Sequence, residues 1–237
     1  MDLPSNLPQR SNIQGFWKLD ETSGERADES GNGNNLSDYN TVGYSSSGKI
    51  DNAGDFEESN SEYLSITDGD QTGLDITGSL SISFWAKWES LENNLYPVSK
   101  WRTTTPDRSY CFQVNINGGN IIKFRTSSNG EAGGIIDITS STTITTGTWF
   151  HIVGVFDNSN NKNIIYVDNS SDDVANNNNI YNSIAAFNIG RTDGGPVYMD
   201  GLIDEVIIWN TALTATEVSK VYNISKYKYF IPKIIIL

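Results

Sequence analysis

Short runs in which apolar and polar residues alternate dominate this sequence, and they constrain its fold more than any other feature. In SISFWAKW, Ile82, Phe84, Ala86 and Trp88 would share one face of a strand, and the residues between them would share the other. SYCFQVNI repeats the pattern, and NIIKFRT follows it after NGG, a typical hairpin turn. Turns rich in Asn, Gly, Ser and Asp separate about a dozen such runs. This spacing predicts an all-β fold in which two antiparallel sheets form a sandwich.

Three segments refine this prediction. TWFHIVGVFD is apolar on both faces, which is typical of a central strand that is covered on both sides. VANNNN, residues 174–179, is predicted to be a polar loop and not a strand. In LTATEV, Thr214 and Glu217 have the spacing of a capping box, and Leu213 and Val218 that of a hydrophobic staple. We therefore predict one short helix close to the C-terminus.

Charge and composition exclude several classes of partner. The formal net charge is −13, whereas nucleic acids and anionic membrane surfaces both require basic protein surfaces. No apolar run is long enough to be inserted across a bilayer, and the first residues show no signal peptide. With one cysteine, Cys111, and one histidine, His151, intrachain disulfides and the usual zinc sites are excluded. We predict that both side chains are packed within strands.

Several blocks of the sequence occur in an order that matches a known family. They are GFWKLDETSGERADESGNGNNL, KIDNAGDFEESNSEYLSI, SLSISFWAKW, GTWFHIVGVFD with IIYVDN, and GLIDEVIIWNTALTATEV. Together they resemble laminin-G-like domains of the concanavalin A-like lectin/glucanase superfamily. The resemblance implies a jelly-roll domain over residues 13–223, a lead segment at 1–12 and a tail at 224–237. YVDNSS and Asn210-Thr211 depart from the family pattern, which affects the expected loops but not the fold.

The resemblance also implies a function. Domains of this family are mostly non-catalytic and bind glycans or proteins, often with a structural calcium ion. The favoured expectation is therefore a carbohydrate-binding protein at a cell or virion surface or outside the cell. A structural or adhesion protein that contacts sister proteins is the alternative, and the apolar end FIPKIIIL favours a packing partner.

The loop DESGNGN is the candidate calcium site. Asp28, Ser30, Asn32 and Asn34 alternate, and the glycines between them let oxygens at alternate positions converge on one cation. We hypothesise that Asp28, Asn32 and Asn34 hold Ca²⁺ and that Asp204 closes the site from the last strand. An ordinary Asx-turn loop accounts for the same residues.

Asp204 and Glu205 lie inside the apolar run GLIDEVIIW. Regular alternation places Asp204 on one face with Leu202, Val206 and Ile208, and Glu205 on the other. The two acids therefore do not form a catalytic pair. Asp204 is expected to need a partner near the edge of the core, and Glu205 to be solvated or paired with a cation.

Catalysis is the third possibility, because some jelly rolls of this superfamily are glycoside hydrolases. Such enzymes carry two carboxylates on one strand, at a separation of about 5 Å in retaining enzymes. Here Glu57, Glu58 and Glu62 straddle a predicted turn, and no suitable pair falls on a predicted strand. We therefore predict no enzyme activity and no catalytic residue.

Glycan recognition requires an exposed aromatic ring next to polar groups. Tyr96 and Trp101 lie outside the regular alternation, with Arg102 next to Trp101, and Tyr181 follows the asparagine run. We predict these four residues to bind the ligand, although Trp101 can equally belong to the core. Tyr198 is a further candidate.

Overall fold

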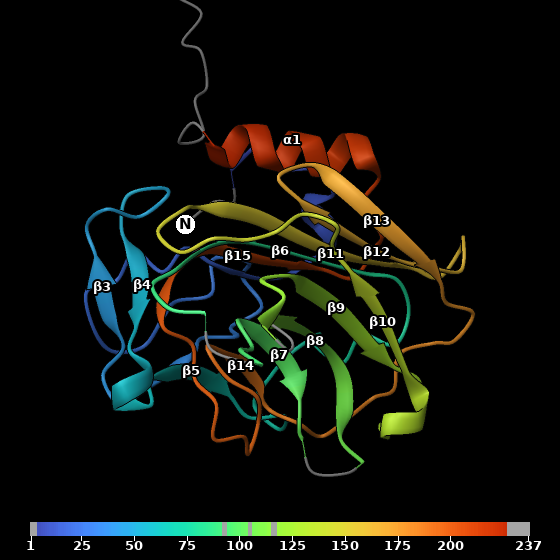
Figure 1. The fold of residues 1–237 in the computed structure, drawn as a ribbon, viewed down its shortest axis with the longest axis horizontal. Helices are drawn as coiled ribbons and strands as arrows, with labels where there is room; N and C mark the ends of the chain where they lie inside the picture. The colour runs from blue at the N-terminus through green and yellow to red at the C-terminus, as the bar shows by residue number, and fades with distance from the viewer. Residues whose placement is uncertain (1–3, 92–93, 104–105, 115–117, 227–237) are drawn as a thin grey trace, which may run out of the picture.

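The computed structural model describes residues 4–91, 94–103, 106–114 and 118–226, and it confirms the predicted all-β sandwich (Figure 1). Two antiparallel sheets pack face to face, and one helix, α1 (Ala215–Lys226), lies on one of them. This helix runs past the predicted boundary at residue 223. The segment FIPKIIIL, which was predicted to pack against a partner, lies outside the described residues.

The eight-stranded sheet contains, in spatial order, β13 (Ser170–Ala175), β12 (Lys162–Val167), β11 (Phe150–Asp157), β6 (Leu80–Trp88), β15 (Gly201–Trp209), β4 (Ala53–Phe56) and β3 (Gly43–Ser45). β1 (Ile13–Trp17) pairs with β15 beside this path. β13 begins a few residues before the predicted loop and includes its first two residues, so that prediction was wrong at Val174 and Ala175.

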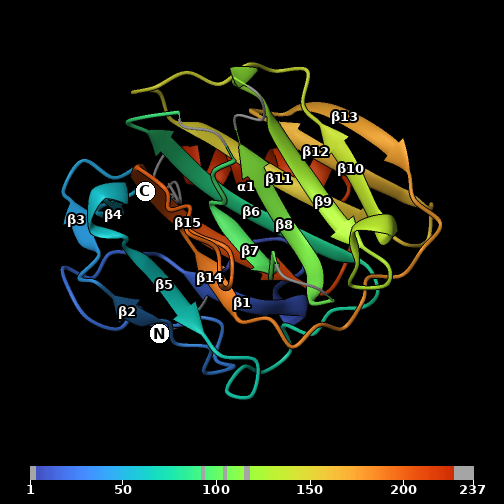
Figure 2. The same ribbon diagram turned by 60° about the horizontal axis from the view of Figure 1, so that its bottom comes forward.

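The seven-stranded sheet contains, in spatial order, β10 (Ile135–Thr139), β9 (Ile122–Ser127), β8 (Arg108–Val114), β7 (Val98–Trp101), β14 (Phe187–Ile189), β5 (Tyr63–Ile66) and β2 (Ser37–Tyr39). Figure 2 looks onto this sheet, with α1 behind the molecule. Short 3-10 helices occur at Arg10–Asn12, Glu58–Asn60 and Ala132–Gly134.

The main core lies between the sheets and is rich in aromatic rings. Phe84 of β6 meets Phe112 of β8 edge-on, and Phe112 contacts Phe124 of β9. Gly154 of β11 leaves room for these rings, because a Cβ there would lie 2.7 Å from the Phe112 ring. Interior packing of this density explains why the aromatic residues alternate so regularly along the strands.

A second apolar cluster forms between α1 and the outer face of the eight-stranded sheet. Val218 and Val221 of the helix pack there with Val153 and Val155 of β11. β11 is therefore covered on both faces, as its apolar sequence predicted. The predicted capping box is confirmed, since the amide of Glu217 donates to Oγ1 of Thr214 and the amide of Thr214 donates to the Glu217 carboxylate.

A β-bulge in β15 changes the predicted faces of the two acids. The register of β15 against β6 shifts between Asp204 and Ile207, and Glu205 has a left-handed φ of 54°. As a result Val206 and Ile208 join the core between the sheets, away from Asp204. Of the two alternatives for Glu205, solvation was wrong, because the residue is 2% exposed, and pairing with a cation stays a prediction.

Candidate functional site

The outer face of the seven-stranded sheet carries the candidate binding surface. Helix α1 covers the outer face of the other sheet, so the two outer faces differ in what lies over them (Figures 1 and 2). Leu64 and Ile66 of β5 point into the core, so alternation turns Tyr63 and Ser65 to the outer face. Ser37 and Tyr39 of β2 pair directly with Ser65 and Tyr63.

Tyr39, Tyr63, Arg191 and Tyr198 form a stack on this face, here called the tyrosine stack. The rings of Tyr39 and Tyr63 are nearly parallel, with centroids 4.5 Å apart. The Arg191 guanidinium lies 4.1 Å from the centroid of Tyr63, and Tyr198 packs beside both. β5 lies between β14 and β2 in the sheet, so Arg191 and Tyr39 occupy opposite faces of the Tyr63 ring. One face of Tyr39 is left uncovered by the stack, and this residue is 40% exposed.

A hollow of about 300 Å³ lies next to Tyr39. Its lining residues are Glu25, Gly33, Asn35, Ser37, Tyr39, Ser65, Ile66, Thr67 and Asp70. Two internal hydrogen bonds fix its polar groups: Nδ2 of Asn35 donates to Glu25 (2.8 Å), and Oγ1 of Thr67 donates to Asp70 (2.6 Å). An open aromatic face beside fixed polar groups is the arrangement that binds a polyhydroxylated ligand.

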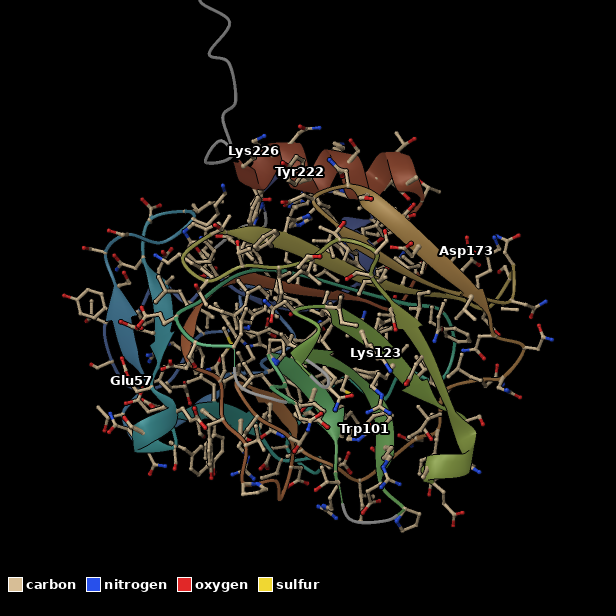
Figure 3. The ribbon with its side chains drawn as sticks, viewed as in Figure 1. Glu57, Trp101, Lys123, Asp173, Tyr222 and Lys226 are labelled. Carbon is tan, nitrogen blue, oxygen red and sulfur yellow. The ribbon has the colours of Figure 1, made fainter. Side chains whose placement is uncertain are left out.

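The prediction that Tyr96 and Trp101 form an open aromatic surface was wrong. Trp101 lies on the side of the molecule away from Tyr222 of α1 (Figure 3), and Tyr96 packs with it, but Tyr96 is only 8% and Trp101 only 2% exposed. They pack with Cys111 into a small cluster, and the guanidinium of Arg125 lies 5.3 Å from the Trp101 ring. Burial raises the pKa of Tyr96 to about 12. Neither ring offers a face to a ligand.

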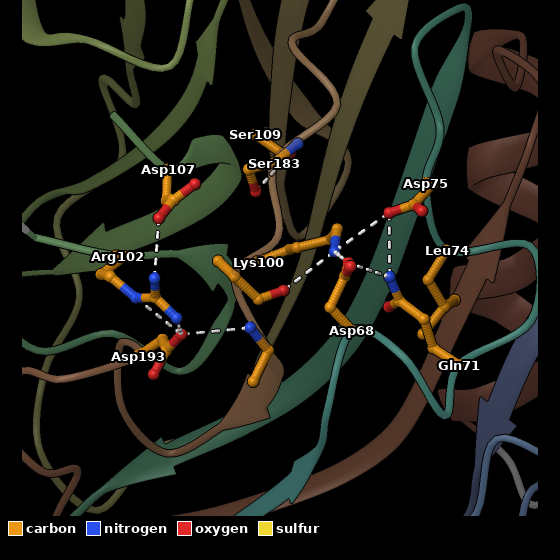
Figure 4. Close-up of polar contacts among 12 residues, drawn as sticks. Asp68, Gln71, Leu74, Asp75, Lys100, Arg102, Asp107, Ser109, Ser183 and Asp193 are labelled. Carbon is orange, nitrogen blue, oxygen red and sulfur yellow. Dashed lines mark hydrogen bonds and ion pairs between the residues drawn. The ribbon is translucent and has the colours of Figure 1, made fainter. Parts of the chain in front are cut away.

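Arg102 and Tyr181 also serve the fold. Arg102 pairs with Asp107 and with Asp193, each at 2.7 Å (Figure 4). These hydrogen bonds raise the pKa of the guanidinium. Tyr181 is half-buried, and its backbone accepts from Oγ of Ser109 and donates to the carbonyl of Ser127. Of the aromatic candidates from the sequence, Tyr198 alone belongs to the tyrosine stack.

Tyr39 was missed as a ligand residue by sequence reasoning. It stands in LSDYN, a run too short to show alternation, and its exposure depends on β2 being an edge strand. The available signal was an aromatic residue just before the turn residue Asn40, which has a left-handed φ of 65°.

The loop of the calcium hypothesis is closed by its own hydrogen bonds. The Asp28 carboxylate accepts from the amides of Phe16, Ser30 and Asn34, and from Oγ of Ser30. The amide group of Asn32 donates to the carbonyls of Ile13 and Gln14. This is the geometry of an Asx-turn loop, the alternative that the sequence allowed.

Asn34 and Asp204, the other two residues of the calcium hypothesis, form hydrogen bonds with different parts of the chain. Asn34 is buried, and its side chain bonds to the carbonyl of Gln14 and to both backbone groups of Thr72. Asp204 instead accepts from the amide of Ile50. Among the described residues, no three His, Cys, Asp or Glu side chains gather as a metal site. In this structure Asp28, Asn32 and Asn34 are thus engaged with protein groups of their own loop and its neighbours, and Asp204 with Ile50.

We expect calcium to leave the stability of the chain unchanged. A ligand at 100 times its Kd adds about 2.7 kcal/mol, which would raise the Tm of a domain of this size by several degrees. Thermal unfolding with CaCl₂ and with EDTA should give the same midpoint. A rise with calcium that Asp28→Asn abolishes would instead support the calcium hypothesis.

Glu62, one of the acids considered for catalysis, and the single histidine, His151, are held inside the fold, whereas Glu57 and Glu58 are half-buried. Glu62 is 4% exposed, and its carboxylate accepts from the amide of Glu57 and from Asn60. Nε2 of His151 lies 2.8 Å from Oγ of Ser83, but both residues are buried beneath α1. Burial lowers the pKa of His151 to about 3. Glu62 and His151 are therefore closed off from the surface.

Comparison with known proteins identifies the family. The family model Laminin_G_3, described as the concanavalin A-like lectin/glucanases superfamily, matches residues 58–219. The chain belongs to this family. No curated protein matches it. No helix in the described part of this family member is long and apolar enough to cross a membrane.

Solved structures share the fold at low sequence identity. Domain 4 of AbnA, a GH43 extracellular arabinanase from Geobacillus stearothermophilus in complex with arabinotriose, is 20% identical with a TM-score of 0.67, over 89% of this chain and 98% of that chain. The binding domain of Paraclostridial Mosquitocidal Protein 1 is 17% identical with a TM-score of 0.69, over 90% and 52%. The binding domain of Botulinum Neurotoxin DC in complex with SialylT is 15% identical with a TM-score of 0.68, over 92% and 52%. The chain thus spans about half the length of these toxin structures.

Proposed function

We propose that this chain is a non-catalytic carbohydrate-binding module of an extracellular or surface protein, and that it binds glycan at the tyrosine stack. The observation that carries the proposal is the exposed residue Tyr39, which stacks on Tyr63 and is one of the residues that line a polar hollow. Sugars present apolar C–H faces to such rings and hydroxyl groups to the polar groups around them.

The stack supports this function because it holds Tyr39 in place before any ligand arrives. Tyr63 and Arg191 restrict the ring, so binding costs little side-chain entropy. The relatives support it as well: the arabinanase domain was solved with arabinotriose and the neurotoxin domain with SialylT. The polar lining of the hollow suits a ligand that carries many hydroxyl groups.

Tyr39→Ala should abolish most of the binding while leaving the fold intact, since Tyr39 is exposed on a short edge strand. We expect affinity for the glycans selected on an array to fall at least about tenfold, as for a central aromatic contact residue. Tyr44→Ala is the matched control, because Tyr44 is 46% exposed but lies on β3 of the other sheet. Calorimetry on the array hits measures both variants.

The outcomes separate the alternatives. Equal binding by the two variants would remove the tyrosine stack from the site. An array without any bound glycan would contradict the proposed function, and self-association or capture of a sister protein would then favour the adhesion role.

A further inference from the structure

The charges that line the hollow next to Tyr39 are acidic. None of the residues that line the hollow, all of them within the described ranges, is lysine or arginine, whereas Glu25 and Asp70 contribute carboxylates. Asn35 holds one oxygen of Glu25, and Thr67 holds one oxygen of Asp70. Both acids are exposed, so the carboxylates can also accept hydrogen bonds from a ligand. The hollow therefore offers mainly acceptors to the group that enters it.

The nearest cation of the stack is separated from this hollow. Arg191 lies against the face of Tyr63 that is turned away from Tyr39, and its Nε donates to the carbonyl of Thr192. Its charge thus stabilises the stack through a cation–π contact with the Tyr63 ring. A ligand in the hollow therefore lies among residues that include the two carboxylates but not this guanidinium.

Acceptors of this kind discriminate between classes of sugar. A neutral sugar donates hydroxyl hydrogens to carboxylates and gains charge-assisted hydrogen bonds. A sugar that carries its own carboxylate or sulfate brings a like charge to Glu25 and Asp70, which costs binding free energy. The formal net charge of −13 adds repulsion at low ionic strength.

We propose that the tyrosine stack selects neutral glycans and rejects sialylated, sulfated or uronic-acid glycans. This inference rests on the proposed function and names its ligand class. It separates this chain from the neurotoxin domain that was solved with SialylT, although the two share a fold. In this chain the selectivity follows from Glu25 and Asp70 and from the position of Arg191.

An array of neutral glycans and their matched sialylated, sulfated and uronic-acid counterparts tests the inference. We expect the strongest signals from neutral glycans and at least about tenfold weaker binding of each acidic counterpart. Raising NaCl from about 50 to about 500 mM should reduce the ratio of neutral-glycan to acidic-glycan affinity, because salt screens exposed charges. The double variant Glu25→Gln/Asp70→Asn should bind acidic and neutral counterparts within about threefold of each other.

The control changes the same charge far from the site. Asp172→Asn/Asp173→Asn alters β13, the edge strand of the other sheet, and should leave the neutral-to-acidic ratio of the unmodified chain unchanged. Preference for an acidic glycan, or equal binding of matched pairs, would overturn the inference and leave the proposed function standing. If Glu25→Gln/Asp70→Asn and Asp172→Asn/Asp173→Asn gave the same ratio of neutral-glycan to acidic-glycan binding, the inference would also be overturned. An array on which nothing binds would overturn both.

Discussion

Asp204→Asn should make the chain more stable than the unmodified protein above about pH 4, by an amount that grows to roughly 6 kcal/mol at pH 9. Asp204 is fully buried in β15, and its Oδ2 accepts from the amide of Ile50 at 2.9 Å. Burial raises its pKa from 3.8 to about 8, and the nearby charge of Asp20 acts in the same direction. An asparagine mimics the protonated form and never carries the buried charge.

The sign of the effect follows from proton binding. Between pH 3.8 and 8 the native state holds a proton on Asp204 that the unfolded chain has released, so stability falls as pH rises. His151 acts in the opposite direction. Its pKa is lowered from 6.5 to about 3, by burial first and then by the charge of Lys49, so stability rises with pH over that window.

The two effects overlap below pH 6.5 and separate above it. From about pH 4 to 6.5 they nearly cancel, because each changes the free energy of unfolding by about 1.4 kcal/mol per pH unit. From 6.5 to 8 Asp204 acts alone, and the unmodified protein should lose about 2 kcal/mol. Asp204→Asn should instead gain stability from about pH 4 to 6.5, through His151, and stay level above that.

Urea unfolding at a series of pH values measures these slopes. Other acids with raised pKa values, such as Asp20 and Asp55, are present in both proteins, so the difference between the two profiles isolates Asp204. His151→Gln is the complementary control: without the opposing effect of His151, its stability should fall as pH rises from about 4 to 8. A difference profile that is flat from pH 4 to 8 would show that Asp204 ionises in its ordinary range.

Much of the fold could be predicted from alternation, because a strand that separates core from solvent records that boundary in every second residue. The regular strands, the helix with its capping box and the family were all accessible in this way. β13 was missed, since SSDDVA lies at a sheet edge and is largely exposed on both faces. The bulge at Asp204 was missed because one inserted residue inverts the faces that follow it.

The candidate site was harder to predict because alternation does not say what covers a sheet face. Trp101 points outward yet is buried, since Tyr96 and the long side chain of Arg125 pack around it. Tyr39 points outward and stays exposed, since β2 is the last strand of its sheet. The difference arises from residues distant in the sequence, and so it requires the three-dimensional structure.

Lys100 is the residue whose partners should matter most for stability. Although its neighbours Ser99 and Trp101 face outward, Lys100 points into the core, where it is fully buried. Its Nζ contacts Asp68 (2.6 Å), Asp75 (3.0 Å) and the carbonyl of Ala185 (2.8 Å) (Figure 4). The two acids are partly exposed, so the cation carries most of the cost of burial.

Asp68→Asn/Asp75→Asn should therefore destabilise the chain by about 3–5 kcal/mol, because it leaves a buried ammonium group without a counter-charge. Lys100→Met removes that cation, fills the same space and lets water solvate the two acids, so its cost should be only about 1–2 kcal/mol. Asp173→Asn, which breaks the exposed pair with Lys162, should change stability by less than about 0.5 kcal/mol. Urea unfolding at pH 7 compares the three proteins. If Lys100→Met lowers the free energy of unfolding as much as Asp68→Asn/Asp75→Asn does, then the ion pairs themselves stabilise this part of the core, and the cost of an unpaired buried ammonium group is not the cause.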